Sequence, residues 1–197
     1  EEKEAIRKGK EFYEKCKEGK KFVDLKSPDQ RVNMKSVHIE GQSQVSGVAE
    51  AVIDASLEEC VAYEFIKDSR EKMTRLKKKR VVKQEIKELN EHSQLYLSER
   101  NLGIPGFSNR EYRTSCIWKK EVLEGGNEKC WVVYGDTAQL DKEFLIKKGN
   151  VLGSSSTVWL FEELEKVGGI PQTKSTMVPS IDIGGSVPKV IMNTQAH

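Results

Sequence analysis

The apolar residues of this chain are grouped in short runs, and two of these runs have the spacing of amphipathic helices. Residues 1–20 carry a sparse apolar stripe at helical spacing, and such a helix needs a partner surface to be stable. The second pattern begins at Ser56, which forms a capping box with Glu59 and precedes apolar residues at intervals of four over 57–65. This second helix is predicted to end between residues 69 and 73.

Most of the remaining chain has the pattern of β-strands separated by turns. Nine runs combine β-branched and aromatic residues with loose alternation, and turn residues such as Gly125–Asn127 separate neighbouring runs. Consecutive strands of this kind predict a long antiparallel sheet, and helices gathered on one side of it give an α+β architecture. Residues 140–148 are predicted to form a loop or a short helix. The predicted strands are 22–25, 32–39, 48–53, 81–89, 94–102, 112–122, 130–138, 151–164 and 175–183.

The strand predicted over 112–122 has two faces of different character. It follows a bent Gly-Ile-Pro-Gly-Phe-Ser loop, and successive side chains of a strand point to opposite faces of a sheet. One face is apolar to weakly polar and the other is mostly charged or polar, so the first face is predicted to line the interior. The first face holds Tyr112, Thr114, Cys116 and Trp118, and the second holds Arg113, Ser115, Ile117 and Lys119.

Composition and charge exclude several function classes. The 197 residues suit one domain with a sizeable core. A net charge of +2 gives no global argument for nucleic acid binding, and no run approaches the roughly eighteen apolar residues of a membrane-spanning helix. The four cysteines lack CxxC spacing and the three histidines are scattered. We therefore expect reduced thiols, a cytoplasmic protein, no metal site and no cofactor.

Basic residues are concentrated between positions 72 and 83. The plainest interpretation is a solvated loop between a helix and the next strand. A second interpretation is contact with an anionic membrane surface, because clustered Lys and Arg are attracted to acidic headgroups. A nuclear address or a nucleic acid patch is the third, although no interleaved aromatic residue is present to stack on a base. The membrane-surface candidates are Lys77, Lys78, Lys79 and Arg80.

Two short motifs and the order of the elements resemble a known family. Residues 106–112 form a turn followed by Ser, Arg, an acid and an aromatic at the start of a central strand. Residues 180–189 combine a final strand with a glycine turn and a proline, and Val190–Asn193 continue as the start of a helix. With a helix after the third strand, these features resemble the START domain, the lipid-transfer domain related to steroidogenic acute regulatory protein. The resemblance covers essentially the whole chain.

The resemblance implies a helix-grip fold, in which a curved antiparallel sheet wraps a C-terminal helix. The N-terminal helix and the helix after the third strand belong to this plan, and we expect the terminal helix to be truncated here. Residues 1–197 would form a single START-like domain excised from a longer protein. The family binds one hydrophobic molecule in an internal tunnel and usually does no chemistry on it, so the expected partner is a phospholipid, a sterol or a fatty-acid-like molecule. A cavity that lacks its terminal helix would expose an apolar groove, so we expect a dimer or a groove filled by another chain.

The resemblance also implies which residues line the tunnel. Sterol-binding members often hold a buried carboxylate and an arginine on neighbouring strands, and by spacing from Arg110 the arginine position falls on Cys116. The facing strand offers Leu95 and Leu97, so we expect a drier tunnel without an anchoring salt bridge. Thr114, Tyr134 and Tyr96 are the candidate polar contacts. The predicted cavity residues are Leu95, Leu97, Tyr112, Thr114, Cys116, Trp118, Val132, Tyr134, Met177 and Ile181.

Two alternatives to lipid binding remain open from the sequence. A degenerate START-like module would regulate or scaffold a larger protein, and its interior would be filled by side chains. A helix-grip enzyme, such as a cyclase or hydrolase, would need titratable groups that converge inside the cavity. The missing charge pair, the truncated ends and the high surface charge motivate the first alternative. The predicted inward set does not indicate the second, because it supplies only tyrosines, a threonine and a thiol. The neighbouring Arg110 and Glu111 are interpreted as a local ion pair at the start of a strand.

Overall fold

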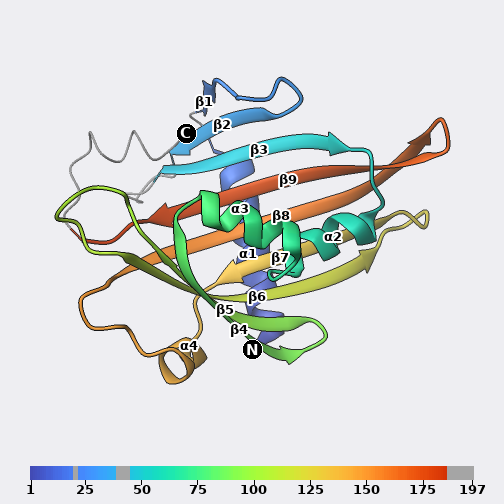
Figure 1. The fold of residues 1–197 in the computed structure, drawn as a ribbon. Coiled ribbons are helices and arrows are strands. Elements are labelled where there is room, and N and C mark those ends of the chain that lie inside the picture. The colour runs from blue at the N-terminus through green and yellow to red at the C-terminus, as the bar shows by residue number, and fades with distance from the viewer. Residues whose placement is uncertain (20–21, 39–44, 186–197) are drawn as a thin grey trace.

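A computed structural model of the chain describes residues 1–19, 22–38 and 45–185. These residues form one curved nine-stranded sheet with helices on both of its faces (Figure 1). The helices are α1 (Glu2–Lys17), α2 (Leu57–Phe65), α3 (Arg70–Lys78) and α4 (Ala138–Glu143). The strands are β1 (Phe22–Leu25), β2 (Asn33–His38), β3 (Val45–Ile53), β4 (Val81–Asn90), β5 (Ser93–Arg100), β6 (Arg110–Val122), β7 (Glu128–Gly135), β8 (Val151–Val167) and β9 (Ile170–Asp182).

The strand order is β1-β2-β3-β9-β8-β7-β6-β5-β4, and all neighbours in this order pair antiparallel. The short strand β7 lies between two long ones. Beyond its last residue, Gly135, the strands β6 and β8 pair directly and in parallel, Arg110–Tyr112 with Val151–Gly153. Where β7 no longer separates them, β6 and β8 come together, so the curved sheet has one strand fewer at this end.

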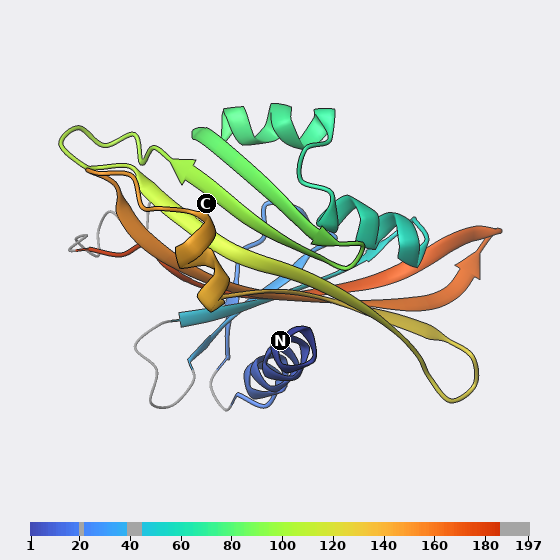
Figure 2. The ribbon, with the colours of Figure 1, turned by 90° about the horizontal axis from the view of Figure 1, so that it is seen from below.

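The two faces of the sheet carry different helices (Figure 2). Helix α1 lies across one face, here called the α1 face, while α2 and α3 lie over the other, here called the α2–α3 face. On the α1 face Tyr13 meets Trp131 edge to face, with 5.2 Å between ring centroids. The helix approaches β7 so closely that a Cβ at Gly9 would lie 2.6 Å from a methyl of Val133. The expectation that the helices gather on one side was therefore wrong.

Helix α2 begins as its capping box predicts. The Ser56 hydroxyl accepts a hydrogen bond from the Glu59 N–H at 3.2 Å, and the Glu59 carboxylate accepts one from the Ser56 N–H at 2.8 Å. The helix ends at Phe65, earlier than predicted. Its apolar stripe covers a core of side chains from the middle strands. That core contains Leu57, Cys60, Val61, Cys116, Cys130, Val132, Tyr134 and Phe161.

The basic segment after α2 forms a helix, so the predicted solvated loop over 72–83 is wrong. Ser69 is the N-cap of α3, and its hydroxyl accepts a hydrogen bond from the Lys72 N–H at 3.4 Å. Lys and Arg are good helix formers, which favours a helix over this segment. The β-branched residues Val81 and Val82 favour a strand, and β4 begins there after α3 has ended. Basic composition alone therefore does not distinguish a solvated loop from a short helix.

The predicted strands and the α+β class are confirmed. The main differences are at the ends of strands: β9 begins at Ile170 rather than at residue 175. The segment 140–148, left open between a loop and a helix, contains the end of α4. The predicted helix start at Ser186–Asn193 lies outside the described residues. Among the described residues, no helix is long and apolar enough to cross a membrane.

Candidate functional site

The α2–α3 face carries a cavity of about 660 Å³. Its floor comes from alternate residues of five adjacent strands, which share one face of the sheet because of the strand period of two. The register supports this, because Tyr96 lies opposite Thr114 and Trp159 lies opposite Met177. The floor residues are Tyr96, Ser98, Arg100, Tyr112, Thr114, Tyr134, Ser155, Thr157, Trp159, Met177, Pro179 and Ile181. The helical side supplies Tyr63, Glu64, Lys67, Lys72, Arg75, Leu76 and Lys79.

The β8–β9 side of this cavity is mainly apolar. The Trp159 ring stacks on Phe161 with 5.6 Å between centroids and 8° between planes, which fixes its orientation beside Met177. Ile181 is 52% exposed, so the apolar surface here is open to solvent. A volume of several hundred Å³ with an apolar wall is typical of sites that bind small molecules.

A glycine in β8 makes room for one aromatic wall of the cavity. A Cβ at Gly153 would lie 2.5 Å from the Tyr112 ring, closer than any ordinary contact. The ring occupies the space that a side chain would otherwise fill. On its β5 side the Tyr112 ring also meets the guanidinium of Arg100, 5.6 Å from the ring centroid. An aromatic face attracts a cation in this geometry.

A polar cluster closes the end of the cavity next to α2. The Glu64 carboxylate accepts hydrogen bonds from the Lys67 ammonium at 2.9 Å and from the Tyr134 hydroxyl at 2.6 Å. Lys67 also donates to the Tyr134 hydroxyl and lies 4.4 Å from the ring centroid. Burial raises the pKa of Tyr134 well above its ordinary value, so the phenol stays protonated. The three groups satisfy one another, as buried polar groups must.

Lys72 adjoins this cluster, and among the described residues it forms no ion pair with a carboxylate. Its ammonium donates to the backbone carbonyl of Glu64 at 2.9 Å and lies 4.8 Å from the centroid of the Tyr63 ring. Burial lowers the pKa of Lys72 to about 8, and the nearby positive charge of Lys67 lowers it in the same direction. Burial and a like charge both disfavour the protonated form.

The structure brings together five of the ten predicted cavity residues. Tyr112, Thr114, Tyr134, Met177 and Ile181 all line the cavity, as does the additional polar candidate, Tyr96. These residues are aligned across the sheet by the antiparallel register.

Three more predicted residues lie on the same face but outside the cavity. Cys116, Trp118 and Val132 pack under α2, which covers this end of the face. Cys116 is fully buried, and burial raises the pKa of its thiol to about 11, which makes it unreactive. The sequence placed these residues on the correct face of the sheet. It did not show which part of that face α2 covers and which part lines the cavity.

Leu95 and Leu97 do not lie in this cavity. Both are on the opposite face of β5, where they pack with Leu140 and Phe144 from the α4 region. The alternation of β5 turns Tyr96 toward the cavity and both leucines away. The expectation that they share the floor with Tyr112 is thus not met, because it assigned the wrong parity to β5.

The expectation that no strand-borne charge pair anchors the ligand did not foresee an ion pair elsewhere in the cavity wall. Glu64 and Lys67 form one, and their side chains are only 17% and 11% exposed. The prediction considered only the strand positions, such as Cys116. The charged residues come instead from the end of α2 and from the segment that follows it, which the sequence argument had not placed near the sheet.

Arg110 and Glu111 do not form the predicted ion pair, because neighbouring residues of a strand point to opposite faces. Arg110 donates hydrogen bonds to the backbone carbonyls of Ser108 at 2.6 Å and Ile183 at 2.8 Å, and so holds the end of β9. Glu111 accepts hydrogen bonds from the Lys147 N–H at 3.3 Å and from the Asn150 amide at 3.2 Å. Both residues have structural roles.

The four membrane-surface candidates have different environments. Lys77 and Lys78 are exposed on α3 and do not line the cavity. Lys79 lines the cavity, and Arg80 donates a hydrogen bond to the backbone carbonyl of Leu102 at 3.0 Å. Lys77 and Lys78 are therefore the candidates whose charges lie on the exposed surface of α3 away from the cavity.

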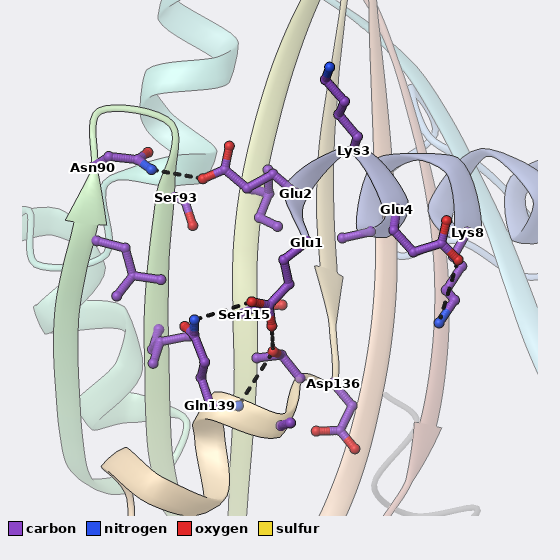
Figure 3. Close-up of a pocket in the computed structure, with 16 residues that line it drawn as sticks. Glu1, Glu2, Lys3, Glu4, Lys8, Asn90, Ser93, Ser115, Asp136 and Gln139 are labelled. Atoms are coloured by element: carbon purple, nitrogen blue, oxygen red, sulfur yellow. Dashed lines mark hydrogen bonds and ion pairs between the residues drawn. The ribbon is translucent and has the colours of Figure 1, made fainter.

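A second cavity, of about 750 Å³, lies between the start of α1, the β4–β5 turn and α4 (Figure 3). Most of the residues that line it are polar or charged, and several of them bind one another. The Asn90 amide donates to the Glu2 carboxylate at 2.7 Å, and the Gln139 amide donates to the Glu1 carboxylate at 3.2 Å. This second cavity lacks an aromatic wall. The α2–α3 cavity has one, so we take the α2–α3 cavity as the candidate site. Among the described residues, no group of acids, histidines and cysteines could hold a metal ion.

Comparison with solved structures identifies the fold. Human StAR-related lipid transfer protein 5 superposes with a TM-score of 0.66 at 14% identity, over 98% of this chain and 89% of that one. The human StarD13 (DLC2) lipid transfer and protein localization domain gives 0.62 at 16% identity, over 98% and 89%. A STAR-related lipid transfer protein from Xanthomonas axonopodis gives 0.60 at 15%, over 89% of each chain.

No family model matches the sequence, and no curated protein matches it. At identities of 14–16%, the likeness to the solved structures concerns the fold. It agrees with the two motifs and the element order that the sequence presents, including the capped helix after the third strand. The chain has the START fold, a helix-grip architecture.

Proposed function

We propose that the chain binds one hydrophobic, lipid-like molecule in the α2–α3 cavity and does no chemistry on it. The observation that carries this proposal is an open cavity of about 660 Å³ with an aromatic and aliphatic wall. Burial of a ligand's apolar surface there would contribute about 25 cal/mol per Å². The proposal is supported by structural neighbours that are named lipid transfer proteins.

The cavity wall argues against a catalytic role. Its described residues contain one carboxylate, Glu64, and neither histidine nor cysteine. The Glu64 carboxylate is already bound by Lys67 and Tyr134, so it is not poised to take a proton from a ligand. A module without a ligand would have a filled interior, and the open wall of Trp159, Met177 and Ile181 argues against that as well.

We also propose that the domain exchanges its ligand with an anionic membrane surface in the cytoplasm. Lys77 and Lys78 are exposed on α3, beside the residues of that helix that line the cavity. Each basic residue near an acidic surface contributes about 1 kcal/mol. All four cysteines are free and buried, which suits a reducing compartment. Replacement of both lysines by glutamate should weaken co-sedimentation with phosphatidylserine vesicles; unchanged binding would contradict the membrane proposal.

Native mass spectrometry of the protein mixed with a total lipid extract tests ligand binding. We expect a bound species of lipid mass on the wild-type protein and its loss from Thr157→Trp, because Thr157 lies on the cavity floor between its strand partners Tyr134 and Pro179. Ser156→Trp is the matched control, since Ser156 is an exposed neighbour in β8 that does not line the cavity. A wild-type protein that retains no lipid, sterol or fatty acid would contradict the proposed function.

A further inference from the structure

The side of α3 that faces the cavity is cationic. Lys72, Arg75, Leu76 and Lys79 line the cavity and follow one another at the spacing of a single helical face. In an ordinary surface helix this inward stripe is apolar, because it packs on the core. Here only Leu76 is apolar, and no residue of α3 is fully buried. The helix therefore presents charge to the cavity instead of closing it with an apolar contact.

The position of Lys72 is unfavourable for the helix itself. It is the third residue of α3, where the positive end of the helix dipole disfavours a cation. The dipole favours Lys77 and Lys78 in the last turn, so helix stability explains them but does not explain Lys72. Lys72 is also partly buried beside Lys67, as its lowered pKa reflects. A charge that local stability disfavours is a common sign of a binding site.

The cavity wall has many more cations than carboxylates. Lys67, Lys72, Arg75, Lys79 and Arg100 all line it, whereas Glu64 is its one described carboxylate. Glu64 is bound to Lys67. The other four cations form no ion pair with a carboxylate in the described ranges. Lys72 instead donates to the Glu64 backbone carbonyl and Arg75 to the Tyr63 hydroxyl, and Arg100 lies over the Tyr112 ring. Four positive charges are therefore left to interact with whatever occupies the cavity.

The charges and the apolar wall of the cavity come from different elements. Helix α3 contacts the edge strand β4, which directly follows it, and is raised above the sheet (Figure 2), while Arg100 lies on the neighbouring strand β5. Trp159, Met177 and Ile181 lie on β8 and β9, with β6 and β7 between them and that edge. The cavity thus has a cationic side and an apolar side, which matches an elongated amphiphile with a charged end.

We propose that the ligand is an amphiphile with an anionic oxygen head group, a carboxylate or a phosphate. Its head lies at Lys72 and Arg75, and its hydrocarbon part lies across the floor toward Trp159 and Met177. Charge-assisted hydrogen bonds to such a head group are stronger than those to a neutral alcohol. This inference rests on the proposed function, since it names the chemical class of ligand for the same cavity.

Three twelve-carbon probes test the inference by displacement of the neutral dye Nile red from the protein. Dodecanoate and dodecyl phosphate carry the two anionic heads, and dodecanol is the neutral control. We expect at least one anion to bind about tenfold or more tightly than dodecanol, and the stronger anion indicates a fatty acid or a phosphate ester as the source. Equal binding of all three would overturn this inference while leaving the proposed function intact. If Nile red and all three probes fail to bind, both are overturned.

Three variants locate the head group. Lys72→Met and Arg75→Met remove a cavity charge, whereas Lys78→Met removes an exposed charge of the same helix as the control. We expect each cavity variant to lose severalfold of its affinity for the anion while its affinity for dodecanol is unchanged. The control should keep the wild-type preference. An equal loss in Lys78→Met, or no loss in the cavity variants, would overturn the placement; thermal melting establishes that each variant is folded.

Discussion

Both faces of the sheet carry large apolar side chains, but these side chains are buried under a helix on one face and line an open cavity on the other. On the α1 face, the helix and the sheet close on each other: Trp131 is 3% exposed and meets Tyr13, and Gly9 lets the backbone approach β7. On the α2–α3 face, α2 covers one end, while Trp159 and Met177 remain at the surface of an open cavity. Closure gives stability to the first face, and the second face leaves apolar surface for a ligand.

The charges of the two faces differ in the same way. At the rim of α1, Lys10 pairs with Glu121 at 2.6 Å and Lys17 pairs with Glu50 at 2.7 Å. On the other face, Lys72 and its neighbours on α3 lack such carboxylate partners among the described residues. A cation at a closed interface is neutralised within the protein. A cation left unpaired beside an open apolar wall is more informative about ligand binding than the apolar wall alone.

The largest expected difference between the faces is in two tryptophan variants. Trp131→Ala should lower the free energy of unfolding by about 3–5 kcal/mol, because it empties a closed core. Trp159→Ala should cost less than half as much, since its side chain is only partly buried, but it should weaken ligand binding. Urea unfolding measures the first quantity and Nile red binding the second.

Each tryptophan variant serves as the control for the other. They lie on adjacent strands, one residue apart in register, and remove the same side chain. Similar losses of stability would mean that the α2–α3 face is closed in solution and that the cavity is filled. Loss of Nile red binding in a folded Trp131→Ala protein would also contradict the division between the faces.

The fold follows from the sequence more fully than the site does. Strand alternation and the capping box at Ser56 depend on neighbouring residues, so the nine strands and the start of α2 were predicted correctly. The face of the sheet on which α1 lies depends on which strand residues its apolar stripe can pack against. That choice rests on contacts such as Gly9 against Val133, which are far apart in the sequence and leave no local signal.

The site was predicted in part for a related reason. Tyr112 and Thr114 were found because alternation within one strand assigns them to one face. Leu95 was misplaced because the parity of β5 relative to β6 was not constrained by sequence. The cations of α3 were visible only as a basic run. A helical period over residues 72, 75, 76 and 79 was the available signal, and it was missed because the segment was interpreted as a loop.

Removal of the cavity carboxylate should affect stability and ligand affinity in opposite directions. Glu64→Gln leaves Lys67 without its ionic partner, so we expect a loss of about 1–3 kcal/mol in the free energy of unfolding. The same change removes the one described acid from the cavity wall, so dodecanoate should bind severalfold more tightly. Thermal melting and Nile red displacement measure the two effects.

A variant of the α1 face is the control for this charge change. Glu121→Gln also removes the partner of a lysine, Lys10, but at a position remote from the cavity. It should leave dodecanoate affinity unchanged. If Glu64→Gln weakens dodecanoate binding in a folded protein, Glu64 contributes to the ligand site directly and the proposed role of the unpaired cations is wrong.

The smallest expected effect is a change of anion affinity with pH. The free protein holds Lys72 with a pKa lowered to about 8, and an anionic head group favours its protonated form. Between pH 7 and pH 9 the lysine loses its charge in the free protein, while the carboxylate of dodecanoate stays ionised. Binding should therefore weaken a few-fold as the pH rises through 8, and dodecanol binding should not change.

Lys72→Arg separates this lysine from the other groups around it. Those groups are Tyr63 and Glu64 of α2, Lys67 after it, Arg75 of α3, and Cys116 and Tyr134 of the sheet. Burial raises the pKa of Cys116 to about 11 and that of Tyr134 well above its ordinary value, so neither group gains charge in this range. Arginine remains protonated, so the variant should bind dodecanoate with nearly constant affinity from pH 7 to pH 9. A decline equal to that of the wild type would show that another group controls the pH dependence and that the head group does not lie at Lys72.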